Sequence, residues 1–377
     1  MKVYLDNGAT TEVSPEVVRA MQPYFTKKYG NASSLHQFGR ETKEALDNSR
    51  KVIAKKLNAH FEEIVFTSGG SESDNSAIKG VAYASEGNQI ITSKIEHPAV
   101  LETCRALEEE GFKVDYLDVD EEGFVNIQQL EKLITKKTIL VSIIHGNNEV
   151  GVIQDIQKIG EICKENGVLF HTDAVQSFTK VPIDVRAVNI DLLSLSSHKI
   201  HGPKGIGALY VRKGIKLNKL IHGGHHEFNL RAGTENIPGV VGFAKAADLL
   251  KFKDIEKMIK LRDYLIKELL KIENTKLNGS LDARLCNNVN ISFGFVEGES
   301  LLLHLDNKGI AVSTGSACSS QSLEPSHVLM AMGLSHETAH GSIRFTLSKY
   351  NKKEEIDYVI KQVNSVVQNL RRISPLK

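Results

Sequence analysis

The chain contains a lysine whose surroundings suit nucleophilic chemistry. Lys199 follows an apolar run and two serines, stands beside His198, and precedes a turn built on Gly202, Pro203 and Gly205. A lysine held just past a strand end, inside such a turn, has its amine aimed at a fixed point. It is a natural nucleophile for a Schiff base with an aldehyde cofactor. Most lysines in a loop before a Gly-Pro turn are solvated, so the lysine alone leaves both interpretations open.

Further polar residues follow other apolar runs. The loop at 67–71 places glycines and hydroxyls at a helix start, where backbone N–H groups and the helix dipole attract phosphate. Asp173 could pair with a pyridinium nitrogen, and His97 offers a ring for stacking and proton transfer. The amides of Asn147-Asn148-Glu149 suit a phenolic oxygen. Taken singly, these features also fit an unliganded helix cap, a turn carboxylate, a structural histidine and a plain turn.

Size and composition are those of an ordinary enzyme. The chain has 377 residues, of which 41% are hydrophobic and 25% charged, and its formal net charge is +1. Near-neutral charge gives no electrostatic reason to expect nucleic acid or acidic membranes as partners. No run approaches the ~18–20 apolar residues of a membrane span, and Met1-Lys2-Val3 leads into structure without a signal peptide. The scattered cysteines fit a reducing, cytoplasmic setting without metal; they are Cys104, Cys163, Cys286 and Cys318.

Apolar runs and helical periodicity alternate along the chain and predict the elements that position these residues. Strands are expected at 1–5, 63–66, 89–92, 113–117, 138–144, 168–172, 190–195 and 206–211. Helices are expected from Pro15, through Leu57 after a cap at 31–34, and at 98–110, 126–135 and 156–166. The second of these helices has Leu35, Ala45, Val52, Ile53 and Leu57 on its apolar side. Such alternation implies an α/β fold with a mostly parallel sheet, whose sites lie at the carboxyl ends of the strands.

A shift in composition near Asp254 indicates a second domain. A long charged helix at 254–272 bridges into it. The remaining elements of this domain are expected to be strands near 288–294 and 342–347 and a last helix near 353–371. The N-terminal strand is expected to pack against them. We therefore predict a large domain over 14–254 and a small α+β domain formed by 1–13 and 255–377.

Motifs spread along the whole chain match one known family. In order they are Tyr4-Leu5-Asp6-Asn7, Gly30-Asn31, Ser33-Ser34-Leu35-His36, Phe66-Thr67-Ser68-Gly69, Glu72, Asp74-Asn75, Asn147-Asn148-Glu149, Thr172-Asp173-Ala174-Val175-Gln176, Ser196-Ser197-His198-Lys199, Arg231-Ala232-Gly233-Thr234-Glu235-Asn236, Asn288-Val289-Asn290-Ile291-Ser292, Gly315-Ser316-Ala317-Cys318-Ser319, Leu323-Glu324-Pro325-Ser326-His327-Val328-Leu329 and Ser342-Ile343-Arg344-Phe345. With these motifs the chain resembles the cysteine desulfurases of the NifS/IscS type, which are class V aminotransferases of pyridoxal 5'-phosphate (PLP) fold type I. The resemblance implies a large domain with a mostly parallel seven-stranded sheet between helices, plus a smaller α+β domain.

The resemblance assigns a role to each matching position. Lys199 would be the Schiff-base lysine and Asp173 the partner of the pyridine nitrogen, while His97 would stack on PLP and exchange protons with the thiol. The other expected cofactor contacts are Asn148 and Gln176 at the phenolate side and Gly70, Ser71, Ser196 and His198 at the phosphate. The residues expected to bind the substrate L-cysteine are Arg344, Asn7, Asn31 and Asn148. Thr234 would reach the phosphate of the neighbouring subunit, which implies a homodimer.

Cys318 decides which reaction this site performs. It lies in a run of small polar residues, Ser313 to Ser322, which buries little apolar surface and is expected to be mobile. A surface thiol in a flexible linker is the alternative to a catalytic role. The resemblance implies that L-cysteine becomes L-alanine while its sulfur passes to Cys318 as a persulfide. An acceptor protein such as an iron–sulfur scaffold then takes the sulfur for cluster, cofactor or tRNA biosynthesis.

The chain departs from the family pattern at four places. Gly8 and Ala32 stand where Ala and Pro are usual. The run Glu227-Phe228-Asn229-Leu230-Arg231 replaces Glu-Arg-Gly-x-Arg, which puts the local loop and its subunit contact in doubt. The chain stops at Lys377, without the extension that longer relatives use to dock the iron–sulfur scaffold, so its acceptor is expected to bind weakly or differently.

Three alternative functions fit parts of the same residue set. A selenocysteine lyase or a small-amino-acid transaminase of this fold would share Lys199, Asp173 and Arg344. A transaminase has no use for a mobile Cys318, whereas a selenium-specific enzyme would ignore cysteine. A non-catalytic sulfur-transfer scaffold would only present Cys318, and the full set of cofactor residues argues against it.

Overall fold

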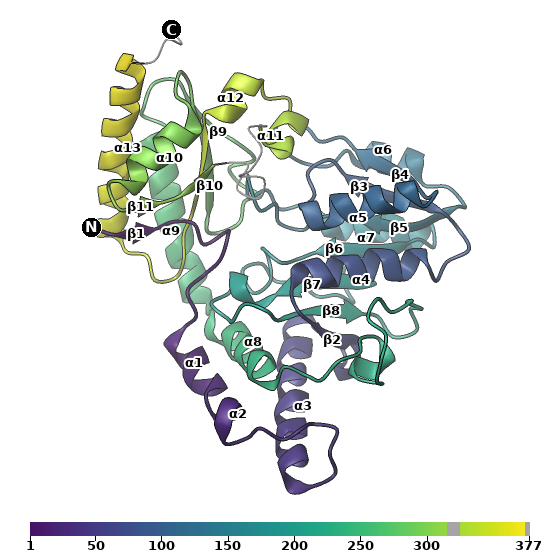
Figure 1. The fold of residues 1–377 in the computed structure, drawn as a ribbon. Helices are drawn as coiled ribbons and strands as arrows, with labels where there is room; N and C mark the ends of the chain where they lie inside the picture. Colours follow the sequence, from purple (N-terminus) through teal and green to yellow (C-terminus); the bar gives the residue numbers. More distant parts are fainter. Residues whose placement is uncertain (315–324, 374–377) are drawn as a thin grey trace.

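The computed structural model describes residues 1–314 and 325–373, and its largest element is a seven-stranded sheet (Figure 1). Strand β8 is antiparallel to both of its neighbours, and the other pairs are parallel. In spatial order the strands are β2 (Ile64–Thr67), β8 (Gly207–Val211), β7 (Leu192–Ser196), β6 (Leu169–Asp173), β5 (Thr138–Ser142), β3 (Gln89–Ser93) and β4 (Lys113–Leu117). The predicted mostly parallel seven-stranded sheet is therefore confirmed.

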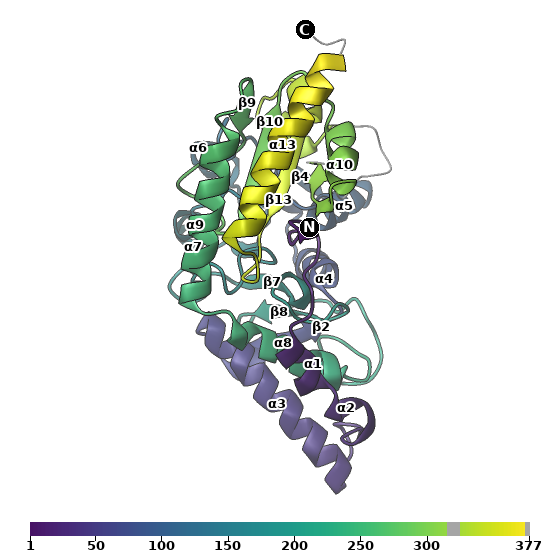
Figure 2. The same cartoon turned by 90° about the vertical axis from the view of Figure 1, so that its left-hand side faces the viewer.

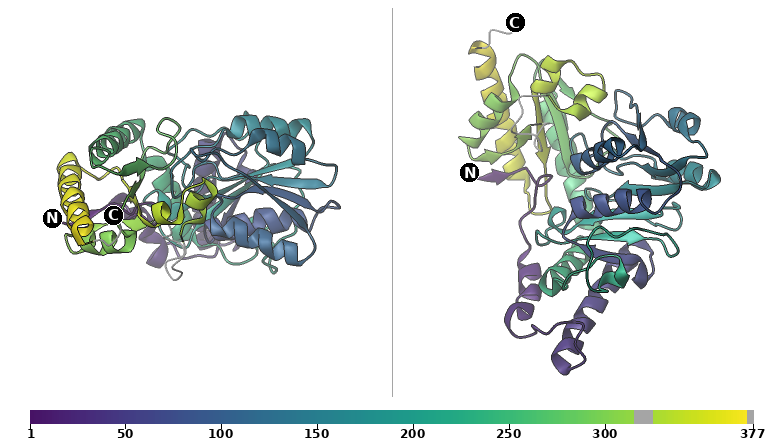
Figure 3. Two further views of the ribbon diagram at one scale, coloured as in Figure 1. Left: turned by 90° about the horizontal axis from the view of Figure 1, so that it is seen from above. Right: turned by 45° about the vertical axis from the view of Figure 1, so that its right-hand side comes forward.

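Helices cover both faces of this sheet, as the view from above shows (Figure 3). Side chains alternate between the faces of a strand, so Ile90 and Ile91 of β3 enter two different hydrophobic clusters. The cluster around Ile90 includes α4 (Gly70–Ala82) and α5 (Pro98–Glu109). The cluster around Ile91 includes α3 (Gln37–Leu57), α6 (Ile127–Leu133), α7 (Ile156–Glu165) and α8 (Ile237–Leu249). Full burial on both faces explains why these strands are continuous apolar runs.

A third hydrophobic cluster forms around a four-stranded antiparallel sheet. Its strands, in spatial order, are β12 (Ser313–Thr314), β13 (Ser342–Thr346), β10 (Asn288–Phe293) and β9 (Thr275–Leu277). The helices in this cluster are α9 (Phe252–Leu269), α10 (Gly298–Asp306) and α13 (Lys353–Ile373). Figure 2 shows α9 and α13 running alongside one another over the sheet.

The N-terminal strand and the C-terminal part of the chain meet in this third cluster. Strand β1 (Val3–Tyr4) pairs in parallel with β11 (Ile310–Ala311), and Val3 and Leu5 are buried there. The predicted packing of the N-terminal strand against the C-terminal part is thus confirmed. The remaining helices are α1 (Pro15–Met21), α2 (Pro23–Thr26), α11 (His327–Ala331) and α12 (His336–His340). None of the helices in the described residues is long and apolar enough to cross a membrane.

The start of α3 differs from the prediction. The helix begins at Gln37, and its N-cap is His36, whose Nδ1 accepts from the backbone N–H of Gly39 at 3.3 Å. Asn31 lies outside the helix, and its Oδ1 accepts from the N–H of Ser33 at 2.8 Å. Leu35 also precedes the helix and is 91% exposed, so its assignment to the apolar side was wrong. Both Asn and His side chains can accept from backbone N–H groups, and the local chain path decides which one caps the helix.

Candidate active site

A cavity of about 160 Å³ is lined by residues from the carboxyl ends of β5, β6 and β7. Every predicted cofactor contact except Thr234 lines it. The lining residues are Gly70, Ser71, Asp74, His97, Ile144, Asn148, Asp173, Val175, Gln176, Ser196, His198 and Lys199. The parallel strands end at the same edge of the sheet, so residues far apart in the sequence converge there.

One end of the cavity has the character of a phosphate site. Helix α4 begins at Gly70 with no side-chain cap on Gly69, so its first N–H groups point out of the helix start. Gly70 itself packs tightly against Val175. A Cβ at this position would come within 2.8 Å of Val175 Cγ2, so a larger residue would crowd the helix start. The buried Ser196 Oγ has no hydrogen-bond partner among the described residues. A buried hydroxyl without a partner is costly, and an anion bound at this helix start would provide one.

The cavity lining also includes buried carboxylates. Asp173 is 4% exposed and its Oδ1 accepts from the N–H of Val175 at 2.8 Å. Burial raises the pKa of Asp173 to about 6, opposed by this hydrogen bond and by Lys199. Asp74 is also buried, and burial together with Asp173 raises its pKa. Because both carboxylates line the cavity, they would stabilise a cation bound in it, such as a protonated ring nitrogen.

A buried histidine stands behind these carboxylates. His171 contacts Ser142 Oγ through Nδ1 at 2.8 Å and Ser194 Oγ through Nε2 at 2.9 Å, and its Nε2 lies 3.7 Å from Asp74 Oδ1. Burial lowers the pKa of His171 to about 3, so the ring is neutral at pH 7. The sequence analysis gave neither Asp74 nor His171 a role. The placement of Asp74 one helical turn after Gly70 is the signal that could have found it.

Lys199 ends a short 3₁₀ turn, Ser197–Lys199, that follows β7. Its Nζ donates to the carbonyl oxygens of Gly8 at 2.6 Å and Ala9 at 2.8 Å. Gln176 Nε2 also donates to the Gly8 oxygen, at 2.8 Å. The N-terminal segment therefore holds the amine at the cavity. Sequence reasoning missed this role, because a backbone acceptor has no residue-type signal.

His97 is the N-cap of α5. Its Nδ1 accepts from the N–H of Ala99 at 3.1 Å, so in the neutral ring the hydrogen is on Nε2. Burial is the main cause that lowers the pKa of His97 to about 4, and the charges of Lys199 and His327 contribute to the same shift. The ring is therefore neutral at pH 7, with its orientation set by the helix cap and Nε2–H as its donor.

The predicted substrate residues are more scattered. Arg344 is 2% exposed, with Nη1 donating to the Asn148 carbonyl at 2.9 Å and Nη2 to Asp6 Oδ1 at 3.1 Å. Its buried Nε has no partner within the described residues, nor has Asn148 Oδ1. Asn7 donates to the Thr346 carbonyl at 2.8 Å and lines a neighbouring cavity. Asn31 and Thr234 are exposed on loops and do not line the 160 Å³ cavity in the single chain, whereas Cys318 lies outside the described residues.

Glu96, next to His97, yields a testable pH effect. It is fully buried, its Oε1 accepts from Ser93 Oγ and the Ile144 N–H, and burial raises its pKa to about 8. The folded protein therefore holds a proton that the unfolded chain releases near pH 4, and stability is lost as pH rises towards 8. We expect Glu96→Gln to remove this loss, so that its stability relative to the unaltered protein grows by at most about 4 kcal/mol between pH 5 and 8. Urea unfolding across this range measures it, and parallel pH curves for the two proteins would contradict it.

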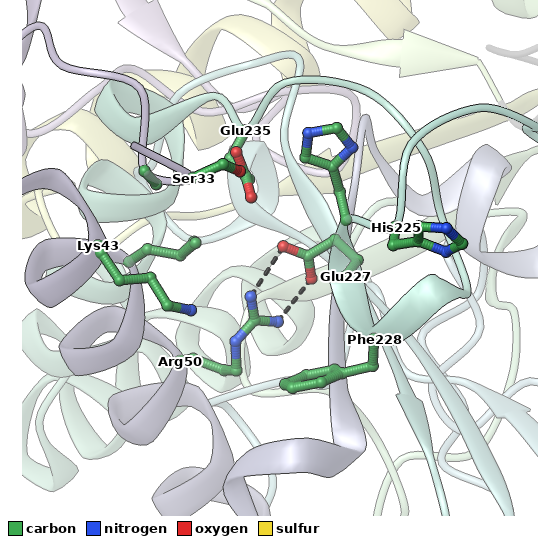
Figure 4. Close-up of a pocket in the computed structure, with 10 residues that line it drawn as sticks. Ser33, Lys43, Arg50, His225, Glu227, Phe228 and Glu235 are labelled. Atoms are coloured by element: carbon green, nitrogen blue, oxygen red, sulfur yellow. Dashed lines mark hydrogen bonds and ion pairs between the residues drawn. The ribbon is translucent and has the colours of Figure 1, made fainter. Parts of the chain in front are cut away.

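The segment 227–231, which departs from the family pattern, supplies one partner of a buried ion pair (Figure 4). Arg50 donates from Nη1 to Glu227 Oε2 at 2.5 Å and from Nη2 to Glu227 Oε1 at 2.8 Å. The ring centroid of Phe228 lies 4.9 Å from the guanidinium carbon of Arg50. Glu227, Phe228 and Asn229 have φ values of 46°, 56° and 65°. Three consecutive left-handed residues are strained, so Phe228 and the ion pair must stabilise the loop.

Removing one partner of this pair should be strongly destabilising. We expect Glu227→Gln to lower the free energy of unfolding by about 3 kcal/mol, because Arg50 stays buried without a counter-charge. Thermal or urea unfolding measures this loss. Asp47→Asn, which breaks the exposed Lys43–Asp47 pair on the same helix, should change stability by less than about 0.5 kcal/mol. Equal effects of the two substitutions would contradict the prediction.

Comparison with known proteins identifies the family of the chain. The chain belongs to the class-V aminotransferase family, whose sequence pattern matches residues 3–359. A protein named cysteine desulfurase IscS from Dictyoglomus turgidum is 54% identical over 382 residues, covering 100% of this chain and 97% of that protein. Another, from Methanosarcina thermophila, is 55% identical over 379 residues, covering 99% and 94%.

Solved structures give the same result. A NifS-like protein superposes with a TM-score of 0.92 at 40% identity, covering 98% of this chain and 100% of that one. A structure described as SspA in complex with cysteine gives 0.85 at 39% identity, covering 93% and 100%. The predicted resemblance to the NifS/IscS type and its fold class are therefore confirmed.

Proposed function

We propose that this protein is a PLP-dependent cysteine desulfurase. The observation that carries the proposal is the cavity in which Lys199, Asp173 and Ser196 meet, together with full-length relatives named cysteine desulfurase. In the net reaction the carbon–sulfur bond of L-cysteine breaks and a sulfur–sulfur bond forms on Cys318. L-cysteine and the Cys318 thiol thus yield L-alanine and a Cys318 persulfide, with atoms and electrons balanced.

The residues present fit PLP. Gly70, Ser71, Ser196 and His198 would hold its phosphate, and the unsatisfied Ser196 hydroxyl supports this placement. Asp173 would hold the ring nitrogen, His97 would stack on the ring, and Asn148 and Gln176 would contact the phenolic oxygen. When bound, PLP supplies an electron sink for the bonds at the substrate's α-carbon.

The chain's own groups then bind the substrate and move protons. Lys199 Nζ would bind the cofactor's aldehyde and, once displaced, carry a proton at the substrate's α-carbon, with Gly8 and Ala9 fixing its position. Arg344 would bind the substrate carboxylate through its guanidinium, whose Nε still lacks a partner in the described chain. His97 would donate from Nε2–H near the reacting sulfur.

The assembly follows the same family pattern. We propose a cytoplasmic homodimer in which Thr234, exposed in the single chain, completes the phosphate site of the partner, and Asn7 and Asn31 border the substrate pocket. The sulfur acceptor would be a protein such as an iron–sulfur scaffold. We also propose that residues 14–254 form the large domain and that residues 1–13 and 255–377 form the small domain. The separate hydrophobic clusters support this division.

A spectrum and a product assay test the function. The purified protein should show PLP absorbance and release alanine and sulfide from L-cysteine with no keto acid present. Cys318→Ser should prevent persulfide formation while keeping the absorbance. A requirement for a keto acid would identify a transaminase. Activity with selenocysteine but not with cysteine would identify a selenocysteine lyase. Absence of bound PLP would identify a non-catalytic scaffold.

A further inference from the structure

Gly8 lies between Lys199 and strand β13, which carries Arg344. Gly8 is buried, and its carbonyl oxygen accepts from Lys199 Nζ at 2.6 Å and from Gln176 Nε2 at 2.8 Å. A Cβ on Gly8 would come within 3.4 Å of Arg344 Cζ, so its backbone lies close to the guanidinium group. Gly8 therefore stands beside both the residue proposed to move the α-proton and the residue proposed to bind the substrate carboxylate.

The other side of Gly8 is bound by Thr346. The Gly8 N–H donates to Thr346 Oγ1 at 2.6 Å. Thr346 follows Arg344 by two positions on β13, so the two side chains leave the same face of the strand. The approach is close, because a Cβ on Gly8 would lie 3.0 Å from Thr346 Cγ2. One hydroxyl therefore links β13 to the residue whose carbonyl oxygen holds the Lys199 amine.

Thr346 is itself held in place. It is 2% exposed, and its N–H donates to the Leu5 carbonyl at 2.7 Å. Its carbonyl oxygen accepts from the Asn7 N–H at 3.2 Å and from Asn7 Nδ2 at 2.8 Å. These bonds fix the backbone of Thr346, so its hydroxyl offers the Gly8 N–H an acceptor at a fixed point.

The direction of the Gly8 carbonyl depends on such fixed points. A glycine has no Cβ to restrict its dihedral angles, so its own stereochemistry does not set this direction. Hydrogen bonds flank the carbonyl on both sides, from the Gly8 N–H to Thr346 and from the Ala9 N–H to the Asp6 carbonyl at 3.0 Å. A buried N–H that loses its acceptor is costly, and the backbone turns to satisfy it. Loss of the Thr346 hydroxyl should therefore move the Gly8 carbonyl.

We propose that Thr346 is a positioning residue for proton transfer at the substrate's α-carbon, because its hydroxyl sets where the Gly8 carbonyl holds the Lys199 amine. The inference rests on the proposed function, in which the α-proton passes to Lys199 Nζ and the electron pair of the broken C–H bond passes to the electron sink that PLP supplies. A misplacement of about 1 Å can lower the rate of such a step by about a hundredfold. The link from Gly8 to β13 keeps the amine in register with a substrate held by Arg344.

Thr346→Ala and Thr346→Ser test this proposal, because they differ by one oxygen atom. Both lose the γ-methyl group, and only the serine can accept from the Gly8 N–H. In the holoenzyme, the α-proton of L-alanine, the product of the proposed reaction, should exchange with solvent deuterium about tenfold more slowly in Thr346→Ala than in Thr346→Ser. KM for L-cysteine should be similar in the two variants, because Arg344 keeps its bonds to Asn148 and Asp6.

Amide hydrogen exchange gives a second measurement, which needs no turnover. The Gly8 N–H should exchange faster in Thr346→Ala than in Thr346→Ser, with or without cofactor. Thr138 provides a matched control pair, because it is buried and its Oγ1 accepts from the Thr135 N–H at 2.8 Å. It begins β5, at the end of the strand away from the cavity. Thr138→Ala and Thr138→Ser should therefore exchange the α-proton of L-alanine at equal rates.

Three results would overturn the positioning role. The first is an equal rate of α-proton exchange in the two folded Thr346 variants, and the second is equal protection of their Gly8 N–H. The third is a tenfold difference within the Thr138 pair as well, since loss of any buried hydroxyl would then slow the reaction. Failure of the unaltered holoenzyme to make alanine from L-cysteine would instead overturn the proposed function, whatever the amide exchange shows.

Discussion

Lys199→Ala is expected to lower the rate of alanine formation by about a thousandfold or more, because the site loses both its covalent attachment for the cofactor and the base that moves the α-proton. The Gly8 and Ala9 carbonyls hold the Lys199 amine at the cavity. Among the described residues that line the cavity there is no second lysine to replace it. Alanine production from L-cysteine, with PLP in excess, measures the loss.

The matched control is Lys204→Ala. Lys204 belongs to the same Gly-Pro turn but is exposed and does not line the 160 Å³ cavity. Its removal should leave the rate within about twofold of the unaltered protein, as for a surface residue without a role in the site. Borohydride reduction followed by mass spectrometry should place the cofactor's mass on Lys199. Attachment at another residue, or appreciable activity in Lys199→Ala, would refute the assignment.

Asp173→Asn should be the next most damaging substitution. The amide can still accept from the Val175 N–H, so the local fold is kept, but it cannot carry the negative charge that a protonated ring nitrogen requires. We expect the rate to fall on the order of a hundredfold or more, the scale for removing a preorganised electrostatic partner. The absorbance of the bound cofactor should shift as well, and a spectrum together with kcat measures both effects.

Asp191→Asn is the appropriate comparison for this substitution. Asp191 is also a buried carboxylate, accepting from the Phe170 N–H at 2.9 Å, but it precedes β7 at the opposite edge of the sheet. Both substitutions therefore remove a buried charge while keeping a backbone acceptor. If Asp191→Asn reduced the rate as much as Asp173→Asn, the loss would reflect folding, and the role of Asp173 at the ring nitrogen would be refuted.

The central strands were predictable because burial on both faces leaves a simple signature. The run at 138–144 contains few polar residues and ends in a polar loop, and the structure places β5 there, buried along its whole length. Helix α8 was not predicted, because Pro238, Gly239 and Gly242 lower its helix propensity. Its buried packing against α3 outweighs that local preference.

The candidate site was predictable only where residue type carries the chemistry. Asp173 ends a strand, Lys199 and His97 come shortly after one, and the parallel sheet brings all three to one edge. The acceptor role of Gly8 and its pairing with Thr346 depend on contacts between distant parts of the chain. No local pattern encodes such a contact, so these residues required coordinates.

The pairing of β1 with β11 has a consequence for biosynthesis. Val3 pairs with Ile310, and the Asn7 N–H donates to the carbonyl of Thr346. These contacts of the N-terminal segment can form only after the C-terminal strands have been synthesised. Until then the Gly8 and Ala9 carbonyls that hold Lys199 have no fixed place. Contacts that span almost the whole sequence form slowly. The site around Lys199 is therefore expected to reach its final geometry only after the C-terminal strands have been synthesised.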